Sequence, residues 1–367
     1  MAELLKNLIN DEFFEHLRIK TSISIPNFNY SKFINLVYDK DWEKRELKDR
    51  TKHIANSFHL ALNEEYPKSI KKILSLLKEV KKEPLTKNGL GYLFFSEYVE
   101  LFGLEYFEIS MKAIEEITQL MSCEFSIRQF ILRYEKETME QMLKWSKHTN
   151  YHVRRLSSEG CRPRLPWAVA IPNFKKDPKL ILPILENLKN DEYEFVRKSV
   201  ANNLNDISKD NPEIVINIAK KWQGVSENTD WIIKHACRTL LKKADSEIYN
   251  IFGINDNPNY KLENFTISEP EVSIGGKLPF SFTLTNENNG STNYRLEYVV
   301  YYLKANGKHS KKLFKIMDKE LKSSESIEVK REQSFQNFTT RKHYKGLHKI
   351  GIVVNGKESD LISFEVV

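Results

Sequence analysis

An acid, two arginines and a tryptophan surround one predicted helix end, in the stretch SSEGCRPRLPW at residues 157–167. Helix-like apolar spacing stops at Glu159. Gly160 and the prolines after it explain the stop, because Gly is common just past a helix end and Pro cannot continue a helix. The stop does not explain the charged and aromatic side chains. Clustered arginines suit a phosphate backbone, and an acid among them either forms ion pairs or acts on a bound molecule.

Acidic residues recur at related places along the same half of the sequence. Glu124 lies four residues before Arg128, and Asp206 lies nine after Arg197. Glu159 lies four residues after Arg155 and therefore on the same helix face. Salt bridging explains any one of these acids alone. Three of them on one surface, beside Trp167, would form a site.

The elements that must position these residues are helical and repeated. Four segments share a basic residue inside a helical pattern, at 123–132, 150–160, 191–204 and 228–241. If their basic residues Arg128, Arg154, Arg197 and Lys234 are equivalent, the offsets are 26, 43 and 37 residues. The last two approach the HEAT period of about 40 residues. We expect an α-helical solenoid over residues 1–255 whose stacked helices bring these positions together on one concave, basic surface.

The remaining residues, 256–367, change to short alternating runs typical of strands. The sequences NNG at 288–290, ANGK at 305–308 and NG at 355–356 are hairpin signals. About seven such strands predict an immunoglobulin-like β-sandwich. It contains no cysteine, so it lacks an inter-sheet disulfide. The expected fold class is therefore a HEAT-like solenoid followed by this sandwich.

Composition excludes several other classes of protein. The chain has 367 residues, of which 40% are hydrophobic, and no run reaches the roughly 20 apolar residues that span a bilayer. Three cysteines without CxxC spacing, and histidines without HExxH, argue against a disulfide framework and a metal site, so we expect no cofactor. The N-terminus does not resemble a signal peptide, which predicts a cytoplasmic protein. A net charge of +7 is modest, and only its placement could favour nucleic acid.

The motif HVRRLSSEGCRPRLPWA, with EFSIRQFI before it and VRKSVANNLNDISKDNP after it, resembles the AlkC branch of the HEAT-like DNA alkylation-repair glycosylases, the superfamily that also contains AlkD. The resemblance covers nearly the whole chain, because many AlkC-type proteins carry a C-terminal immunoglobulin-like domain. It implies excision of cationic alkylated bases, notably N3-methyladenine, from double-stranded DNA. An alkylated base is a good leaving group and needs no general acid. Carboxylates can then stabilise the oxocarbenium-like sugar and orient water, without a nucleophilic lysine.

The resemblance also assigns roles to individual residues. It implies that Glu124, Glu159 and Asp206 are the catalytic carboxylates, with Asp210 a competitor for the third position. It implies that Trp167 packs against the lesion nucleotide, and the alternative is a core tryptophan. HEAT-like members hold DNA in an open groove and do not enclose the base in a tight pocket.

Basic residues form the expected DNA contacts. Arg155, Arg162 and Arg164 are candidates near the lesion, although Arg162 could instead form a buried pair with Glu159. Further candidates on the helices are Arg154, Arg197, Lys198, Lys234 and Arg238. For Arg197 and Lys234 the alternative is a helix cap or an inter-repeat salt bridge.

The loop at 337–349 is the basic segment of the β domain, and residues 257–367 together hold 17 basic and 13 acidic residues. Its residues Arg341, Lys342, His343 and Tyr344 are predicted to clamp DNA. The alternative is a solvated hairpin in which Tyr344 forms a tyrosine corner.

Two other functions compete with that of a glycosylase: a HEAT-repeat protein scaffold, and a module that binds DNA structure without catalysis. The acids, arginines and tryptophan at 124–167 favour the enzyme, because scaffolding does not need them. The expected partner is alkylated duplex DNA, with no membrane and no small-molecule cofactor, and the protein is expected to be a monomer.

Overall fold

The computed structural model describes residues 4–85, 87–338 and 341–367. The chain forms two compact units. The first contains residues up to 215 and residues 224–236, and the second contains residues 216–223 and 237–367. The predicted boundary between residues 255 and 256 lies just before the first strand, and the short helices that precede it group with the second unit.

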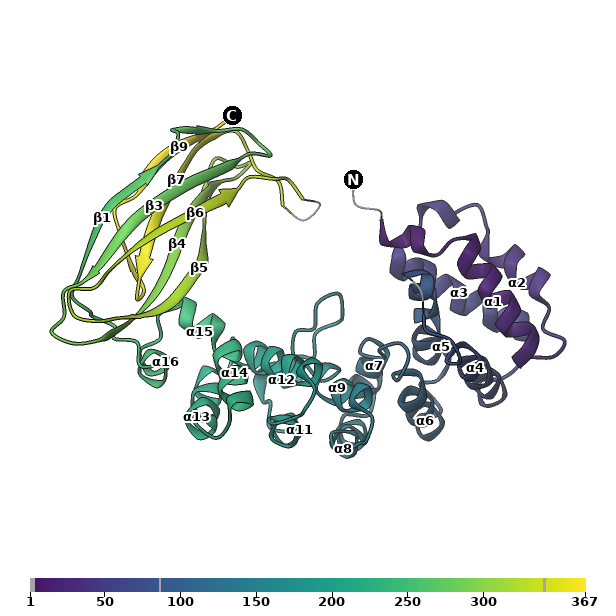
Figure 1. Ribbon diagram of the computed structural model, residues 1–367. Coiled ribbons are helices and arrows are strands. Elements are labelled where there is room, and N and C mark those ends of the chain that lie inside the picture. Colours follow the sequence, from purple (N-terminus) through teal and green to yellow (C-terminus); the bar gives the residue numbers. More distant parts are fainter. Residues whose placement is uncertain (1–3, 86, 339–340) are drawn as a thin grey trace. The chain divides into compact units, whose positions relative to one another are not determined.

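The first unit is helical (Figure 1). Its α-helices are α1 (Asp11–Ser24), α2 (Tyr30–Val37), α3 (Leu47–Leu62), α4 (Tyr66–Val80), α5 (Phe94–Phe102), α6 (Phe107–Ile117), α7 (Ser126–Arg133), α8 (Glu135–Trp145), α9 (Tyr151–Glu159), α10 (Pro172–Lys176), α11 (Leu182–Leu188), α12 (Glu194–Ile207) and α14 (Glu227–Ala236). Short 3-10 helices occur at Leu5–Leu8, Trp42–Lys44 and Lys87–Leu93. The remaining α-helices of the chain are α13 (Pro212–Trp222), α15 (Arg238–Lys242) and α16 (Ser246–Ile251).

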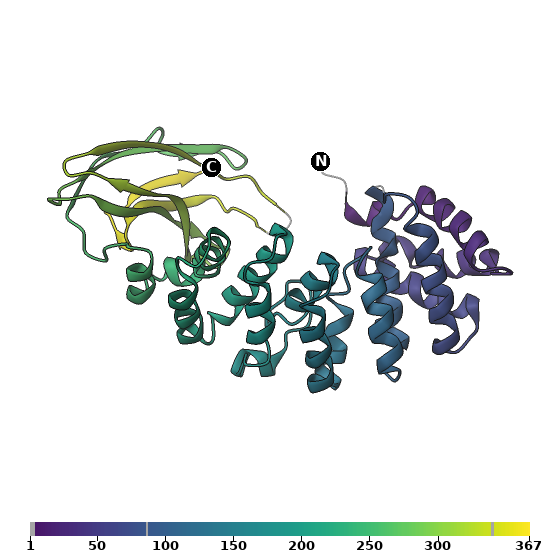
Figure 2. The same cartoon turned by 60° about the horizontal axis from the view of Figure 1, so that its bottom comes forward.

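Apolar residues at helical spacing bury one face of each helix. In α12 the buried apolar residues Val196, Val200, Leu204 and Ile207 form such a stripe, and α12 packs on α9 and α14. Figure 1 shows α7, α9 and α12 in one row and α6, α8 and α11 in the other. Figure 2 shows the helices of this unit lying alongside one another. Helical repeats are therefore confirmed, with one difference: the predicted helix at 228–241 breaks at Cys237 into α14 and α15.

The second unit contains a sandwich of two sheets. Its strands are β1 (Tyr260–Ile267), β2 (Glu271–Val272), β3 (Lys277–Asn286), β4 (Thr292–Leu303), β5 (His309–Leu321), β6 (Ser326–Ser334), β7 (Gly346–Val354), β8 (Lys357–Glu358) and β9 (Ile362–Val366). One sheet has the order β1-β3-β6 and the other β2-β9-β7-β4-β5, with β8 paired to β7. Alternating residues of β3, such as Phe280 and Phe282, enter the core between them.

Two of the three predicted hairpin signals are confirmed. ANGK joins the antiparallel pair β4 and β5. Asn355 and Gly356 join β7 and β8 with φ of 45° and 81°, the positive values that a tight hairpin turn requires. The NNG prediction was wrong, because that segment connects β3 in one sheet to β4 in the other. A turn signature indicates a chain reversal, whereas the partner strand is chosen by packing.

Within the described ranges, no helix is both long and apolar enough to cross a membrane. In the same residues, no three His, Cys, Asp or Glu side chains are grouped so that they could hold a metal ion.

A buried acid on α5 makes the stability of the helical unit depend on pH. Burial raises the pKa of Glu97 to about 7, and Glu100 adds to the shift while Lys48 and Lys52 of α3 oppose it. Since the folded state binds this proton more tightly than the unfolded chain, its stabilising contribution is present at low pH and lost as pH rises toward 7. We expect wild-type unfolding free energy to fall by about 2–3 kcal/mol between pH 5 and pH 8 through this group.

Glu97→Gln removes this dependence, so in urea unfolding it should be more stable than wild type at pH 8 and gain little at pH 5. The exposed Glu108 of α6 provides the control, as Glu108→Gln. Parallel pH profiles for wild type and Glu97→Gln would contradict the assignment.

Candidate active site

The C-terminal ends of α9 and α12 bring two of the predicted carboxylates together. Glu159 is the last residue of α9, and Asp206 is the penultimate residue of α12. Buried polar contacts lock the two helices: the Ser158 hydroxyl donates to the Ser199 hydroxyl at 2.7 Å, and the Asn203 amide donates to the Ser158 carbonyl at 2.7 Å. Side chains at these two ends therefore meet in a defined geometry.

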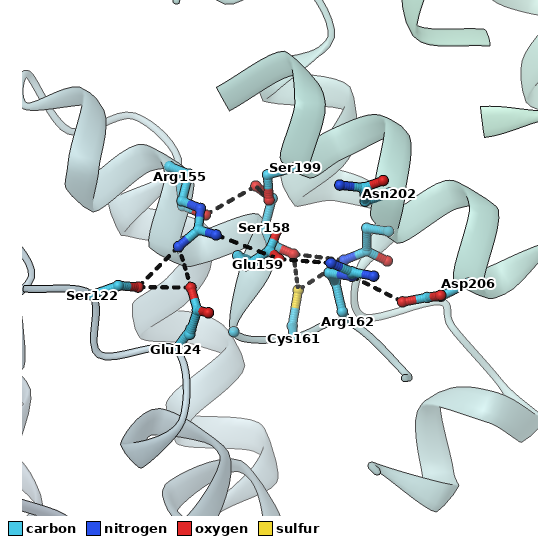
Figure 3. Close-up of polar contacts among 12 residues, drawn as sticks. Ser122, Glu124, Arg155, Ser158, Glu159, Cys161, Arg162, Ser199, Asn202 and Asp206 are labelled. Atoms are coloured by element: carbon cyan, nitrogen blue, oxygen red, sulfur yellow. Dashed lines mark hydrogen bonds and ion pairs between the residues drawn. The ribbon is translucent and has the colours of Figure 1, made fainter. Parts of the chain in front are cut away.

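A chain of alternating acids and bases connects all three predicted carboxylates (Figure 3). The Arg155 guanidinium binds Glu124 and lies 3.4 Å from Oε1 of Glu159. The Arg162 guanidinium donates to Glu159 at 2.7 Å and to Asp206 at 2.9 Å. Each arginine therefore joins two carboxylates, and Arg155 and Arg162, predicted to contact phosphates, are paired with acids of the chain itself.

The three carboxylates differ in how many of their oxygens are occupied. Both arginines contact Oε1 of Glu159. Among the described residues, no donor contacts its Oε2. Glu124 likewise receives Arg155 and the Ser122 hydroxyl on Oε2 alone, which leaves Oε1 without a donor from the described chain. In Asp206, Arg162 occupies Oδ2 and Lys209 occupies Oδ1. Glu124 and Glu159 therefore each have one oxygen without a donor from the described chain, whereas each oxygen of Asp206 accepts one.

The charged side chains of Glu159, Arg162 and Asp206 are almost completely buried. Glu159 and Asp206 are 5% and 2% exposed, and both lie at helix C-termini, whose partial negative charge disfavours an acid. Burial alone would lower the pKa of Arg162, but Glu159 and Asp206 outweigh it, so this pKa lies above its ordinary value. Arg162 is therefore held as a cation by its two acids. The predicted alternative, a buried pair with Glu159, is what the structure shows, and this leaves little of Arg162 available to DNA.

Gly160 follows Glu159 for a different reason from the one predicted. Its φ is −62°, within the right-handed region, so the helix does not end through a left-handed glycine. A Cβ at this position would lie 2.5 Å from Cγ2 of Ile127. Gly160 is therefore required by the close approach of α7, which allows the chain after α9 to turn against that helix.

Arg128 has a role that the repeat pattern did not reveal. This side chain is fully buried, and it donates to the carbonyls of Gly160, Arg162 and Val169 at 2.9, 2.7 and 2.7 Å. Burial lowers its pKa to about 10. Arg128 therefore holds the turn at 160–169 through its carbonyls. Only the packing of α7 against this turn identifies that role.

Trp167 is not a core residue. It is 74% exposed and has a φ of 63°. A left-handed backbone costs a non-glycine residue on the order of 1–3 kcal/mol and persists only where the surroundings hold it. The alternative of a core tryptophan is therefore wrong, and packing against the lesion nucleotide stays a prediction.

The two candidate aspartates, Asp206 and Asp210, pair with different arginines, and Arg164 binds the second of them. It forms a bidentate pair with Asp210 at 2.6 and 2.8 Å, on the surface. Asp206, by contrast, joins the buried chain through Arg162. The geometry therefore places Asp206 in the site, and Asp210 outside it.

Arg154 and Arg197 are structurally equivalent, as the repeat predicted. Arg154 donates to the carbonyls six and five residues before it, His148 and Thr149, and Arg197 does the same with Asp191 and Glu192. Arg154 also pairs with Asp191 of the next repeat. Arg154 therefore forms the inter-repeat salt bridge named as the structural alternative, although it was predicted to contact DNA. Both guanidiniums bind carbonyls of the loop before their own helix and are not helix caps, because the start of a helix has free N–H groups. The equivalence does not extend to Arg128, whose partners lie after α9.

The other predicted helical contacts are scattered. Lys198 pairs with Glu194 one turn earlier on α12. Lys234 is exposed on α14, and Arg238 is half-buried on α15.

The β-domain loop forms a basic recess of about 600 Å³. Arg341, Lys342, His343 and Tyr344 line it together with Lys304, Lys311 and Lys312. Lys342 is exposed and Arg341 half-buried, whereas His343 is only 6% exposed, so its ring is poorly placed for a phosphate. Among the described residues Tyr344 makes no hydrogen bond of the tyrosine-corner kind. Residues 339 and 340 of the predicted loop lie outside the described residues.

Comparisons with known proteins agree with this architecture. The family model described as a DNA alkylation repair enzyme matches residues 97–240, and the one described as the C-terminal Ig-like domain of uncharacterised protein YhaZ matches residues 261–367. The chain is 41% identical over 366 residues to uncharacterized protein YhaZ of Bacillus subtilis (strain 168), covering 100% of both.

A solved structure is similar over the same extent. The Pseudomonas fluorescens alkylpurine DNA glycosylase AlkC, bound to DNA containing an abasic site analog, matches with a TM-score of 0.93 and 32% identity, covering 100% of both chains. The predicted immunoglobulin-like character of the β domain is thereby confirmed. The chain belongs to the AlkC-type family of DNA alkylation repair proteins with a C-terminal Ig-like domain.

Proposed function

We propose that this protein is a DNA glycosylase that removes cationic N3-alkylated bases from duplex DNA. One observation carries the proposal: Glu124 and Glu159 are bound to Arg155 through one oxygen each and keep the other oxygen for a ligand. Full-length similarity to an alkylpurine DNA glycosylase bound to DNA supports DNA as the ligand.

The reaction follows from the charges. Alkylation at N3 makes the base a cationic leaving group, so the bond between C1′ and the base nitrogen breaks with its electron pair going to the base. The sugar then carries oxocarbenium character, which fixed carboxylates stabilise without reorganising. A water oxygen adds to C1′, and its proton passes to a carboxylate acting as general base. Glu159 and Glu124 supply these functions, and Asp206 positions Arg162.

No lysine is needed for this sequence of steps, so we propose a monofunctional enzyme that leaves the DNA strand intact. Trp167, exposed at the turn after Glu159, packs against the lesion nucleotide. Arg164 contacts phosphate nearby.

The test is to incubate the protein with methylated duplex DNA and to measure released N3-methyladenine by chromatography. Release, with abasic sites but no nicks, supports the proposal. Binding without release would favour a non-catalytic DNA-binding module, and neither binding nor release would favour a protein scaffold.

Arg341 and Lys342 are the β-domain residues best placed for phosphates, because they line the basic recess. We expect Arg341→Ala with Lys342→Ala to weaken DNA binding and to reduce the slope of log affinity against log salt by about 1.8, since each lost phosphate contact removes about 0.9. Fluorescence anisotropy from 50 to 200 mM salt measures this slope.

The matched control removes the same charge elsewhere in the sandwich. Lys261 and Lys330 are exposed and pair with Glu263 and Glu328 on their own strands. The double variant Lys261→Ala with Lys330→Ala should leave the slope near that of wild type. Equal slopes for both double variants would place the loop away from DNA.

A further inference from the structure

We propose that Arg128 and Lys48 are positioning residues that together hold the turn at 160–169 and present Trp167 to the substrate. Both act through backbone carbonyls of this turn, from two different helices. The reading of Trp167 as a substrate contact rests on the proposed function, whereas the restraint on the turn is a property of the chain alone.

The turn cannot hold itself in shape with its own hydrogen bonds. Pro163 and Pro166 have no backbone N–H, so they cannot donate to a neighbouring carbonyl. Among the described residues, backbone N–H groups reach only two carbonyls of residues 160–169, that of Leu165 from Ala168 at 3.3 Å and that of Pro163 from Ile171 at 3.2 Å. Carbonyl groups of the turn therefore need donors from elsewhere.

Arg128 supplies three of those donor contacts from α7. Its guanidinium binds the Gly160, Arg162 and Val169 carbonyls, and so it joins the start of the turn to its end. A buried guanidinium normally pairs with a carboxylate, yet among the described residues Arg128 forms no ion pair. Arg128 also binds the carbonyl of Arg162, and the Arg162 side chain donates to Glu159. Arg128 therefore restrains the backbone of the residue that binds Glu159.

Lys48 supplies the remaining contact from α3. Its ammonium donates to the Trp167 carbonyl at 3.2 Å and lies 4.2 Å from the centroid of the Phe125 ring, next to Glu124 in sequence. Trp167 has the left-handed backbone of this turn, a conformation that other contacts must stabilise. Lys48 binds the carbonyl of that same residue and therefore holds the indole outward.

Lys48 gives the sharper test because it is exposed, so its replacement leaves the core intact. Lys48→Met keeps the aliphatic stem and removes the donor, whereas Lys48→Arg keeps a donor. Lys52→Met is the matched control, because Lys52 is exposed one turn along α3 and its side chain forms no hydrogen bond or ion pair within the part of the chain that the structure describes. Hydrogen–deuterium exchange of a peptide spanning residues 160–171, in the full-length protein without DNA, reports the turn directly.

We expect Lys48→Met to speed exchange in this peptide about 5-fold, with α9 and α12 unchanged, and Lys48→Arg to restore most of the protection. Single-turnover base release should fall about 3- to 10-fold in Lys48→Met, with little change in affinity for undamaged DNA. Exchange in Lys48→Met no faster than in Lys52→Met would overturn the role of Lys48.

Arg128→Lys tests the second residue and retains the buried charge. We expect faster exchange confined to 160–171 and slower base release, together with a lower melting temperature because carbonyls of the turn lose their donor. Faster exchange throughout α7 and α9 would instead make Arg128 a general stabiliser and overturn its positioning role. If wild type releases no base, the proposed function fails, while the exchange measurements still decide whether these cations hold the turn.

Discussion

Glu159→Gln should release methylated base about 10²- to 10³-fold more slowly than wild type in single-turnover reactions, while binding DNA as tightly. The loss corresponds to about 2.7–4 kcal/mol, the range seen when one fixed charge or donor facing a transition state is removed. Folding should survive, because Arg162 retains Asp206 and Arg155 retains Glu124 as partners. The amide keeps an oxygen for Arg162 but cannot stabilise a cation or take a proton from water.

Glu105→Gln is the control, since Glu105 also pairs with an arginine, Arg133, but on the surface, whereas Glu159 lies between two buried arginines. Its rate of base release should equal that of wild type. If Glu159→Gln retains the wild-type rate, the carboxylate is structural and the catalytic assignment is wrong.

Arg162→Met should destabilise the helical unit by about 3–5 kcal/mol, because it leaves buried acids without their shared cation. After the change, Glu159 keeps only Arg155 at 3.4 Å, and Asp206 keeps only Lys209. Urea unfolding followed by circular dichroism measures the loss. Adding Asp206→Asn should recover part of it, since the double variant no longer buries that unpaired charge.

Arg164→Met is the control from the same turn. Arg164 has an equally short bidentate pair with Asp210, but both side chains are about one-third exposed. Exposed pairs contribute little, so this loss should stay below about 1 kcal/mol. Equal losses for Arg162→Met and Arg164→Met would show that burial does not set the energetics of the site.

Local pattern was enough to predict the fold. Period 3.6 in one half and period 2 in the other decide which faces are buried, and burial drives folding, so helices and strands follow from spacing. Helix spacing likewise predicted Arg155 as a neighbour of Glu159, because residues four apart share a helix face, whereas a pair between Arg162 and Glu159 was only the alternative to a DNA contact.

Contacts between distant segments decided the rest. Arg128, Arg154 and Arg197 occupy similar places in the repeat, yet Arg154 and Arg197 bind carbonyls of the loop just before their own helices, while Arg128 reaches a turn some 30 to 40 residues away. Spacing could not separate them, because a side chain's partner depends on which segments pack nearby. Spacing likewise could not explain Gly160, because a glycine is required there by the close approach of the Ile127 side chain.

The sequence by itself therefore determined the order of domains, the family motif and the set of charged residues. Only the tertiary structure decided which oxygens of Glu124 and Glu159 stay unoccupied, that Asp206 rather than Asp210 joins them, and that Trp167 faces outward. The physical reason is that hydrogen bonds and ion pairs act over about 3 Å. Their partners are fixed only when helices from distant parts of the chain are packed together.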